Sequence, residues 1–269
     1  MSATTTDHVT VDSLGTVDVT VSERGQGHPF LLLHGGGGPQ TVTAWADQLA
    51  GARHARVLTP VHPGFDGTLR PGALDSVGTL ARVYVALLDQ LKLRDVTVAG
   101  NSIGGWITAE MAVLGPDRVS SYVLIDAVGI EVPGHPVADF FSLTPAQVTQ
   151  RSFYDPDTFG ADPATLPPEA QAAMAAVRAA LAVYAGAGMT DPTLAGRLAD
   201  VDAPVLVVWG KADRIGDPDY GRAYADAIPG AQFRLLEHAG HLPQLEAPGA
   251  LIDAVWSFAD AHAASKPVR

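Results

Sequence analysis

The stretch Val96-Thr97-Val98-Ala99-Gly100-Asn101-Ser102-Ile103-Gly104-Gly105 decides the fold of this 269-residue chain. Residues 96–99 predict a buried strand, and apolar residues at helical spacing begin near Gly104. A serine with glycines two positions before and after it, at a turn from strand to helix, is typical of a nucleophile elbow, because the glycines avoid Cβ clashes. Ser102 is therefore the candidate nucleophile. A tight turn without catalysis is the alternative.

Short apolar runs of the same kind recur along the chain, at residues 29–33, 55–59, 122–125, 205–209 and 232–236. Helical patterns lie between them, at residues 80–91, 104–114, 219–227 and 250–259. This alternation predicts an α/β fold with a mostly parallel sheet covered by helices on both faces. Such sheets bind ligands at the carboxyl ends of their strands. An alternating pattern around Gly15 adds an antiparallel hairpin near the N-terminus.

The alternation of strand and helix fails over residues 131–200, which contain several prolines and an Ala-rich helical stretch at 168–184. We predict that this segment is a helical lid inserted over the carboxyl edge of the sheet. Residues 1–130 and 201–269 then form the two parts of the core. A small subdomain without a functional role is the alternative.

A serine hydroxyl is a weak nucleophile at neutral pH and needs a general base within hydrogen-bond reach. His241 follows the last predicted strand and precedes the last helix, so we expect it at the same sheet edge as Ser102. His238 is the competing base, and its position nearer the strand favours a structural role. The two histidines do not form a metal motif, because no His-Glu-x-x-His sequence or clustered acid accompanies them.

The base needs a carboxylate to fix its tautomer. Asp213 follows the predicted strand at 205–209, which gives the chain order Ser102, Asp213, His241. Asp126 ends the preceding strand and is the rival acid, and we assign it a structural or lid-contacting role.

The run His34-Gly35-Gly36-Gly37-Gly38-Pro39 follows the strand at 29–33. Consecutive glycines let backbone N–H groups converge, and with the Ile103 N–H they form a candidate oxyanion hole. Gly36 is the preferred donor and Gly37 the second. Gly-rich loops also bind phosphate, but no Gly-Lys-Ser/Thr follows this one.

These four signals, in this order and over nearly the whole chain, resemble the α/β-hydrolase superfamily of serine hydrolases. The motifs His-Gly-Gly-Gly, Gly-Asn-Ser-Ile-Gly-Gly, Gly-Lys-Ala-Asp and Gly-His-Leu-Pro are similar to those of carboxylesterases, lactonases, cofactor-free perhydrolases and meta-cleavage C–C bond hydrolases. The resemblance implies the α/β-hydrolase fold, with a lid between the sixth and seventh strands.

Two departures from the family pattern bear on the substrate. The C–C hydrolases usually carry Trp directly after the catalytic histidine, where this chain has Leu242. The loop at 61–68 places His62 and Asp66 where the family has other residues. Either these two residues are satisfied within their own loop, or they contact the substrate.

Four side chains near the predicted site are candidate substrate contacts: His34, Trp106, Phe140 and Leu242. Packing is the alternative for two of them, within the helix after the elbow for Trp106 and within the lid core for Phe140.

The composition limits the possible partners. The net charge is −12, with 29 Asp+Glu against 17 Lys+Arg, so the chain repels nucleic acid and anionic lipid. There is no cysteine, which excludes a thiol nucleophile and thiolate metal sites. No signal peptide or membrane span is visible. We expect a soluble cytoplasmic protein that takes a small-molecule substrate without cofactor or metal. The sequence does not decide whether the protein is a monomer or a homo-oligomer.

The sequence therefore predicts a serine hydrolase that cleaves a small to medium, apolar ester or lactone through an acyl-enzyme. A C–C bond hydrolase would use the same triad and an Arg in the lid, for which Arg151 and Arg178 are the options. An acyl transferase or perhydrolase would differ only in the acceptor. A noncatalytic receptor of this fold would bind its ligand and leave esters intact.

Overall fold

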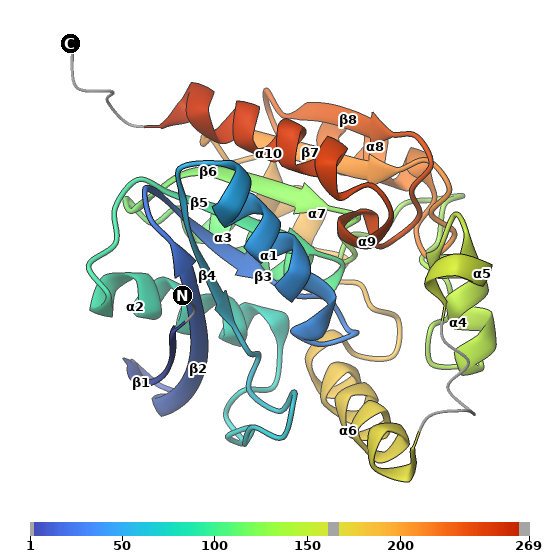
Figure 1. Cartoon of the computed structure of the whole chain (residues 1–269), viewed down its shortest axis with the longest axis horizontal. Coiled ribbons are helices and arrows are strands. Elements are labelled where there is room, and N and C mark those ends of the chain that lie inside the picture. The colour runs from blue at the N-terminus through green and yellow to red at the C-terminus, as the bar shows by residue number, and fades with distance from the viewer. Residues whose placement is uncertain (1–2, 161–166, 264–269) are drawn as a thin grey trace.

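The computed structural model describes residues 3–160 and 167–263, arranged around one eight-stranded sheet (Figure 1). The strand order is β1-β2-β4-β3-β5-β6-β7-β8. Only the pairs β1·β2 and β2·β4 are antiparallel, and the other neighbours run parallel. The strands are β1 Ala3–Val11, β2 Gly15–Gly25, β3 His28–Leu33, β4 Ala55–Pro60, β5 Val96–Asn101, β6 Val119–Ile125, β7 Val205–Gly210 and β8 Gln232–Leu236. The predicted mostly parallel sheet is confirmed.

The central strands are mostly apolar because helices cover both faces of the sheet. In β3, Phe30 and Leu32 belong to one core cluster, whereas Leu31 and Leu33 belong to the other. Every residue of β5 and β7 is buried. Strand β2, second from the edge of the sheet, instead alternates between buried and exposed residues over much of its length.

Two helices cover one face, α1 Gln40–Ala52 and α10 Pro248–His262. Three others cover the opposite face, α2 Val77–Gln90, α3 Ile103–Leu114 and α8 Pro218–Asp226. The one-turn helix α9 Pro243–Glu246 connects the loop after β8 to α10. The predicted α/β class, with helices on both faces, is confirmed.

Between β6 and β7 the described residues 126–160 and 167–204 form four helices: α4 Pro145–Ser152, α5 Pro156–Phe159, α6 Pro168–Ala185 and α7 Leu194–Leu198. Figure 1 shows α4 and α5 side by side at the right of the molecule, with α6 below them. We call residues 131–160 and 167–200 the helical insert. Ser152 of α4 contacts the loop after β8, and Leu181 of α6 contacts the loop after β3. Because both loops follow the carboxyl ends of strands, the insert lies against the carboxyl edge of the sheet.

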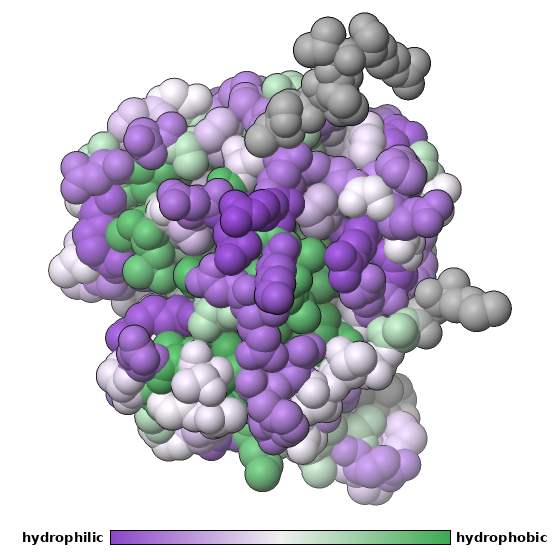
Figure 2. All heavy atoms as spheres, turned by 90° about the vertical axis from the view of Figure 1, so that its left-hand side faces the viewer, coloured by the Kyte–Doolittle hydropathy of each residue, from purple (hydrophilic) through white to green (hydrophobic). Residues whose placement is uncertain are grey.

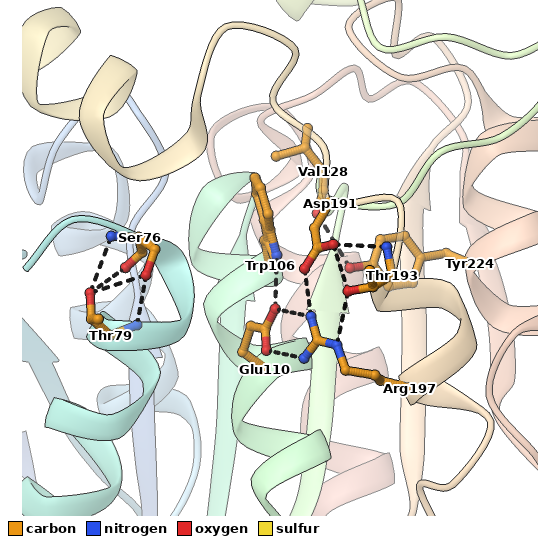
Figure 3. A network of polar contacts seen from close by, with 9 residues as sticks. All are labelled: Ser76, Thr79, Trp106, Glu110, Val128, Asp191, Thr193, Arg197 and Tyr224. Carbon is orange, nitrogen blue, oxygen red and sulfur yellow. Dashed lines mark hydrogen bonds and ion pairs between the residues drawn. The ribbon is translucent and has the colours of Figure 1, made fainter.

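A partly buried ion-pair network joins the insert to the core (Figure 3). The Arg197 guanidinium of α7 donates two hydrogen bonds to Glu110 of α3, at 2.6 and 2.8 Å, and one to Asp191 at 2.6 Å. The indole of Trp106 donates to the same Glu110 carboxylate at 3.4 Å. Because α3 begins directly after Ser102, the network fixes the insert against the helix that follows the candidate nucleophile.

On the face that Figure 2 shows, hydrophilic residues surround smaller groups of hydrophobic ones. Within residues 3–160 and 167–263, no helix is both long and apolar enough to cross a bilayer.

Candidate active site

Ser102 stands at a sharp turn between β5 and α3, with φ 57° and ψ −118°. Such a conformation is strained for a residue other than glycine, and it persists only where the surroundings enforce it. The glycines on either side allow the turn. A Cβ on Gly100 would lie 2.1 Å from the Gly104 carbonyl oxygen, and one on Gly104 would lie 2.3 Å from the Leu33 carbonyl oxygen.

The structure brings Ser102, His241 and Asp213 together from three separate loops. Nε2 of His241 lies 2.9 Å from Ser102 Oγ, and Nδ1 lies 2.8 Å from Asp213 Oδ2. Because a carboxylate only accepts hydrogen bonds, Nδ1 carries the proton and Nε2 is free to accept the serine proton. All three residues are buried, with relative exposures of 6% or less. This chain of hydrogen bonds can transfer a proton from a hydroxyl to an imidazole.

Asp213 is oriented by backbone donors of its own loop. Its Oδ1 accepts hydrogen bonds from the N–H groups of Ile215, at 2.7 Å, and Gly216, at 3.3 Å. The other oxygen is thereby directed to His241.

The loop that carries His241 is fixed on several sides. The His241 N–H donates to the Ser152 carbonyl of α4 at 2.7 Å, and the His241 carbonyl accepts from the side-chain amide of Asn101. Gln244 in turn donates to Asn101 Oδ1 at 3.1 Å. Sequence reasoning missed these supports, because the contacting residues are separated by up to 143 positions and have no local signature.

Glu246 of α9 is a further anchor that the sequence did not indicate. One carboxylate oxygen accepts from the Gly240 N–H at 2.7 Å and from the Tyr154 N–H at 3.1 Å, and the other accepts from the Asp155 N–H at 2.9 Å. Glu246 therefore joins the loop of the candidate base to the insert.

The glycine loop after β3 lies beside Ser102. A Cβ on Gly35 would lie 3.2 Å from Ser102 Cβ, and one on Gly36 would lie 3.0 Å from Leu181 Cδ2 of α6. The loop turns through a hydrogen bond from the Gly38 N–H to the Gly35 carbonyl at 3.1 Å. Ile103 is the first residue of α3, so its N–H has no acceptor within the helix.

His34 and His62 form a buried pair behind this loop, with ring centroids 3.7 Å apart. His34 Nδ1 donates to the Gly35 carbonyl, and its Nε2 accepts from the His62 N–H at 3.1 Å. His62 Nε2 donates to the His34 carbonyl at 2.9 Å, and its Nδ1 accepts from the Tyr84 hydroxyl. Burial lowers the pKa of His34 to about 4 and that of His62 well below 6.5, and the neighbouring His34 lowers the latter further.

All four ring nitrogens of His34 and His62 therefore hydrogen bond within the protein. His34, a predicted substrate contact, is fully buried and supports the glycine loop. Asp66, the other unusual residue of the loop at 61–68, is exposed.

The other predicted substrate contacts lie in different surroundings. Trp106 is 4% exposed, and its ring packs against Gly129, where an added Cβ would lie 2.5 Å away. Phe140 is partly buried beneath the Arg178 guanidinium, whose central carbon lies 5.0 Å from the ring centroid. Leu242 is partly buried directly after His241.

Neither rival candidate takes the place of Asp213 or His241, because the acid bonded to His241 is Asp213 and the base bonded to Ser102 is His241. His238 is exposed, has φ 55°, and contacts the Tyr154 ring edge to face at 5.2 Å between centroids. Asp126 is fully buried directly after β6, and its Oδ1 accepts from the Gly210 N–H at 2.7 Å. Burial, followed by the charge of the neighbouring Asp213, raises the pKa of Asp126 well above its usual range.

The sequence is similar to a known family of enzymes and to several of its members. The sequence model of the Alpha/beta hydrolase family matches residues 30–254. The chain is 27% identical over 263 residues to a 2-hydroxy-6-oxo-6-(2'-aminophenyl)hexa-2,4-dienoic acid hydrolase of Metapseudomonas resinovorans, an alignment that covers 91% of this chain and 88% of the relative. It is 31% identical over 235 residues to Lipase 1 of Psychrobacter immobilis, covering 82% of this chain and 73% of the lipase.

Among solved structures, a thermophilic esterase from Thermogutta terrifontis superimposes with a TM-score of 0.77. The sequence identity is 23%, and the superposition covers 97% of this chain and 100% of the esterase. At this identity the likeness concerns the fold.

Proposed function

Because the chain belongs to the alpha/beta hydrolase family and is an enzyme of the hydrolase class, we propose that it cleaves small to medium, apolar carboxylic esters or lactones through an acyl-enzyme. The observation that carries this proposal is the hydrogen-bonded series from Ser102 through His241 to Asp213. Such a series activates a serine for attack on a carbonyl carbon.

In this mechanism His241 Nε2 takes the Ser102 proton as Oγ forms its bond to the carbonyl carbon. The N–H groups of Gly36 and Ile103, with Gly37 as the second loop donor, stabilise the resulting oxyanion. His241 then returns the proton to the leaving alcohol as the carbon–oxygen bond breaks. Water, deprotonated by His241, cleaves the acyl-enzyme and regenerates Ser102.

Apolar residues of the helical insert support an apolar acyl group. Leu181 of α6 lies against the loop, and the aromatic pair Phe140 and Phe141 packs in the same insert, with its rings at 90° to each other. In this proposal the insert acts as a lid that covers the acyl group and excludes water. Removing water strengthens the hydrogen bonds to an oxyanion.

A meta-cleavage C–C hydrolase is the second candidate, because the relative from Metapseudomonas resinovorans carries that activity in its name. Such a substrate has a carboxylate that needs a cation. Arg178 is already engaged, since its guanidinium donates to the backbone carbonyls of Phe140 and Phe141 at 2.9 and 2.6 Å. Arg151 is exposed. These placements favour the ester over the dienoate.

The test combines a fluorophosphonate probe with p-nitrophenyl esters of rising chain length and a 2-hydroxy-6-oxo-dienoate. We expect wild type to be labelled and to hydrolyse the esters, and Ser102→Ala to do neither. Preference for the dienoate by kcat/KM would favour the second candidate. Labelling without hydrolysis of any substrate in water, but with acyl transfer to an added alcohol or peroxide, would favour an acyl transferase or perhydrolase.

A further inference from the structure

Three titratable side chains meet beside the candidate nucleophile: Asp126, Asp213 and His241. One oxygen of each carboxyl group and one ring nitrogen lie within 4.8 Å of one another. The proposed mechanism uses Asp213 and His241 and leaves Asp126 without a role. The surroundings of Asp126 identify one.

The two oxygens of Asp126 differ. Oδ1 accepts the Gly210 N–H, but Oδ2 is buried and has no hydrogen-bond donor among the described residues. An ionised carboxylate only accepts hydrogen bonds, and a buried acceptor without a donor is costly. A proton on Oδ2 converts that oxygen into a donor, and the nearby acceptor is Asp213, one of whose carboxylate oxygens lies within 4.8 Å of a carboxyl oxygen of Asp126.

We propose that Asp126 is a neutral carboxylic acid that donates its Oδ2 proton to Asp213, so that the pair holds one proton and one negative charge. Asp126 is then a positioning residue, which acts on His241 through Asp213. Its role as a proton donor depends only on the geometry of the pair, whereas its effect on catalysis rests on the proposed function.

The charges around Asp126 favour this state. Asp213 and His241 face it from the loops after β7 and β8, and Glu246 of α9 adds a second negative charge. Two carboxylates in contact cannot both ionise easily. Burial and the charge of Asp213 both raise the pKa of Asp126.

The backbone directs the side chain to this position. Asp126 has φ 44°, a left-handed conformation that is costly for a residue with a Cβ. Its N–H donates to the Val208 carbonyl at 2.9 Å, which holds the residue against the end of β7. Asp213 Oδ1 already accepts from Ile215 and Gly216, so the donation from Asp126 completes its restraint.

The variant Asp126→Asn separates this proposal from a charged Asp126. Its amide keeps an acceptor for the Gly210 N–H and a donor for Asp213, and under the proposal it removes no charge. We measure the fluorophosphonate labelling rate and kcat/KM for a p-nitrophenyl ester against pH. Both should stay within about threefold of wild type. The acid limb of the pH profile, where activity falls as His241 is protonated, should lie at the same pH as in wild type. Asp213→Asn, which removes the charge, should fall by roughly 10⁴-fold.

A fall of the acid limb by about one pH unit or more in Asp126→Asn would overturn the proposal, because it would mean that a negative charge had left the surroundings of His241. A second variant, Asp126→Val, removes the donor. Its labelling rate per folded molecule should drop by about 10- to 100-fold. Equal rates for the Asn and Val variants would also count against a proton donated to Asp213.

Infrared spectroscopy of the wild-type protein tests for the proton on Asp126 without an activity measurement on any variant. At pH 7 ordinary Asp and Glu side chains are ionised, so the carbonyl stretch of a protonated carboxyl group, shifted in D₂O, should be present. Its absence, or a stoichiometric metal ion in the purified protein, would overturn the proposal. If wild type is neither labelled nor hydrolytic, the proposed function fails, whereas this spectrum still decides the state of Asp126.

Discussion

The side-chain amide of Asn101 donates a hydrogen bond to the backbone carbonyl of His241, with a nitrogen-to-oxygen distance of 2.9 Å. Asn101 is the residue directly before Ser102. One short segment therefore carries the candidate nucleophile and also restrains the loop of its base. This contact between the neighbour of Ser102 and the backbone of His241 helps to hold the two reacting side chains together.

The first prediction concerns this restraint. Asn101→Ala should lower kcat/KM by about tenfold, because the loss of one buried hydrogen bond loosens the position of His241. Thr97→Val is the matched control on the same strand: Thr97 is buried and pairs with His28 and Ser121, away from the site. Both variants should be less stable, and only Asn101→Ala should lose activity per folded molecule. Equal losses would refute the restraint.

The second prediction concerns the turn at Ser102. Gly104→Ala should destabilise the protein by about 3 kcal/mol, since its Cβ would meet the Leu33 and His34 carbonyl oxygens at 2.3 and 2.6 Å. Gly78→Ala in α2 is the control, because an added Cβ there meets nothing within 4 Å. It should stabilise by about 0.5–1 kcal/mol. Urea unfolding measures both, and a mild effect of Gly104→Ala would argue against close packing of strand and helix.

The third prediction concerns acid stability. The pKa of buried His34 is lowered from 6.5 to about 4, so the folded state prefers the neutral ring. The unfolded chain takes up the proton first as pH falls below 6.5, and stability should decrease from there to about pH 4. The loss from this ring is on the order of 3 kcal/mol.

Unfolding free energies at pH steps between 7 and 4 check this prediction. His34→Asn should flatten the dependence relative to wild type, whereas His8→Gln at an exposed position should not. Parallel curves for wild type and His34→Asn would show that His34 titrates normally in the folded protein.

The fourth prediction concerns the network in Figure 3. Arg197→Met leaves the Glu110 carboxylate, 7% exposed, without its main partner. The protein should lose about 2 kcal/mol of stability, less than for a fully buried pair because the Arg197 side chain is 36% exposed. The double variant with Glu110→Gln should recover part of this loss. Labelling of Ser102 should be unchanged, and a large change would place the network in the catalytic machinery.

Local patterns were enough to predict the sheet and the positions of three candidate residues. The glycines around Ser102 predict the turn, because the backbone is too crowded at Gly100 and Gly104 for a residue with a Cβ. Asp213 and His241 follow apolar runs that became β7 and β8, and parallel strands bring such loops to one edge.

The supporting contacts could not be predicted in the same way. Asn101, Gln244 and Glu246 are ordinary polar residues in the sequence, and their partners lie up to 143 positions away. For His62 the sequence does not decide between a contact within its loop and a contact with substrate, because its hydrogen bonds to His34 and Tyr84 depend on how the loops after β3 and β4 pack. The first helix, α1, was not assigned from the sequence.

The three hydrogen bonds that Glu246 accepts constrain how substrate range can change. A rearrangement of α4 or α5 to admit a bulkier molecule has to displace the histidine loop or break charge-assisted bonds. The helix α6, which reaches the glycine loop through Leu181, is not held by Glu246. Directed evolution toward larger acyl chains should therefore accumulate its changes in α6 and leave the 152–155 segment intact.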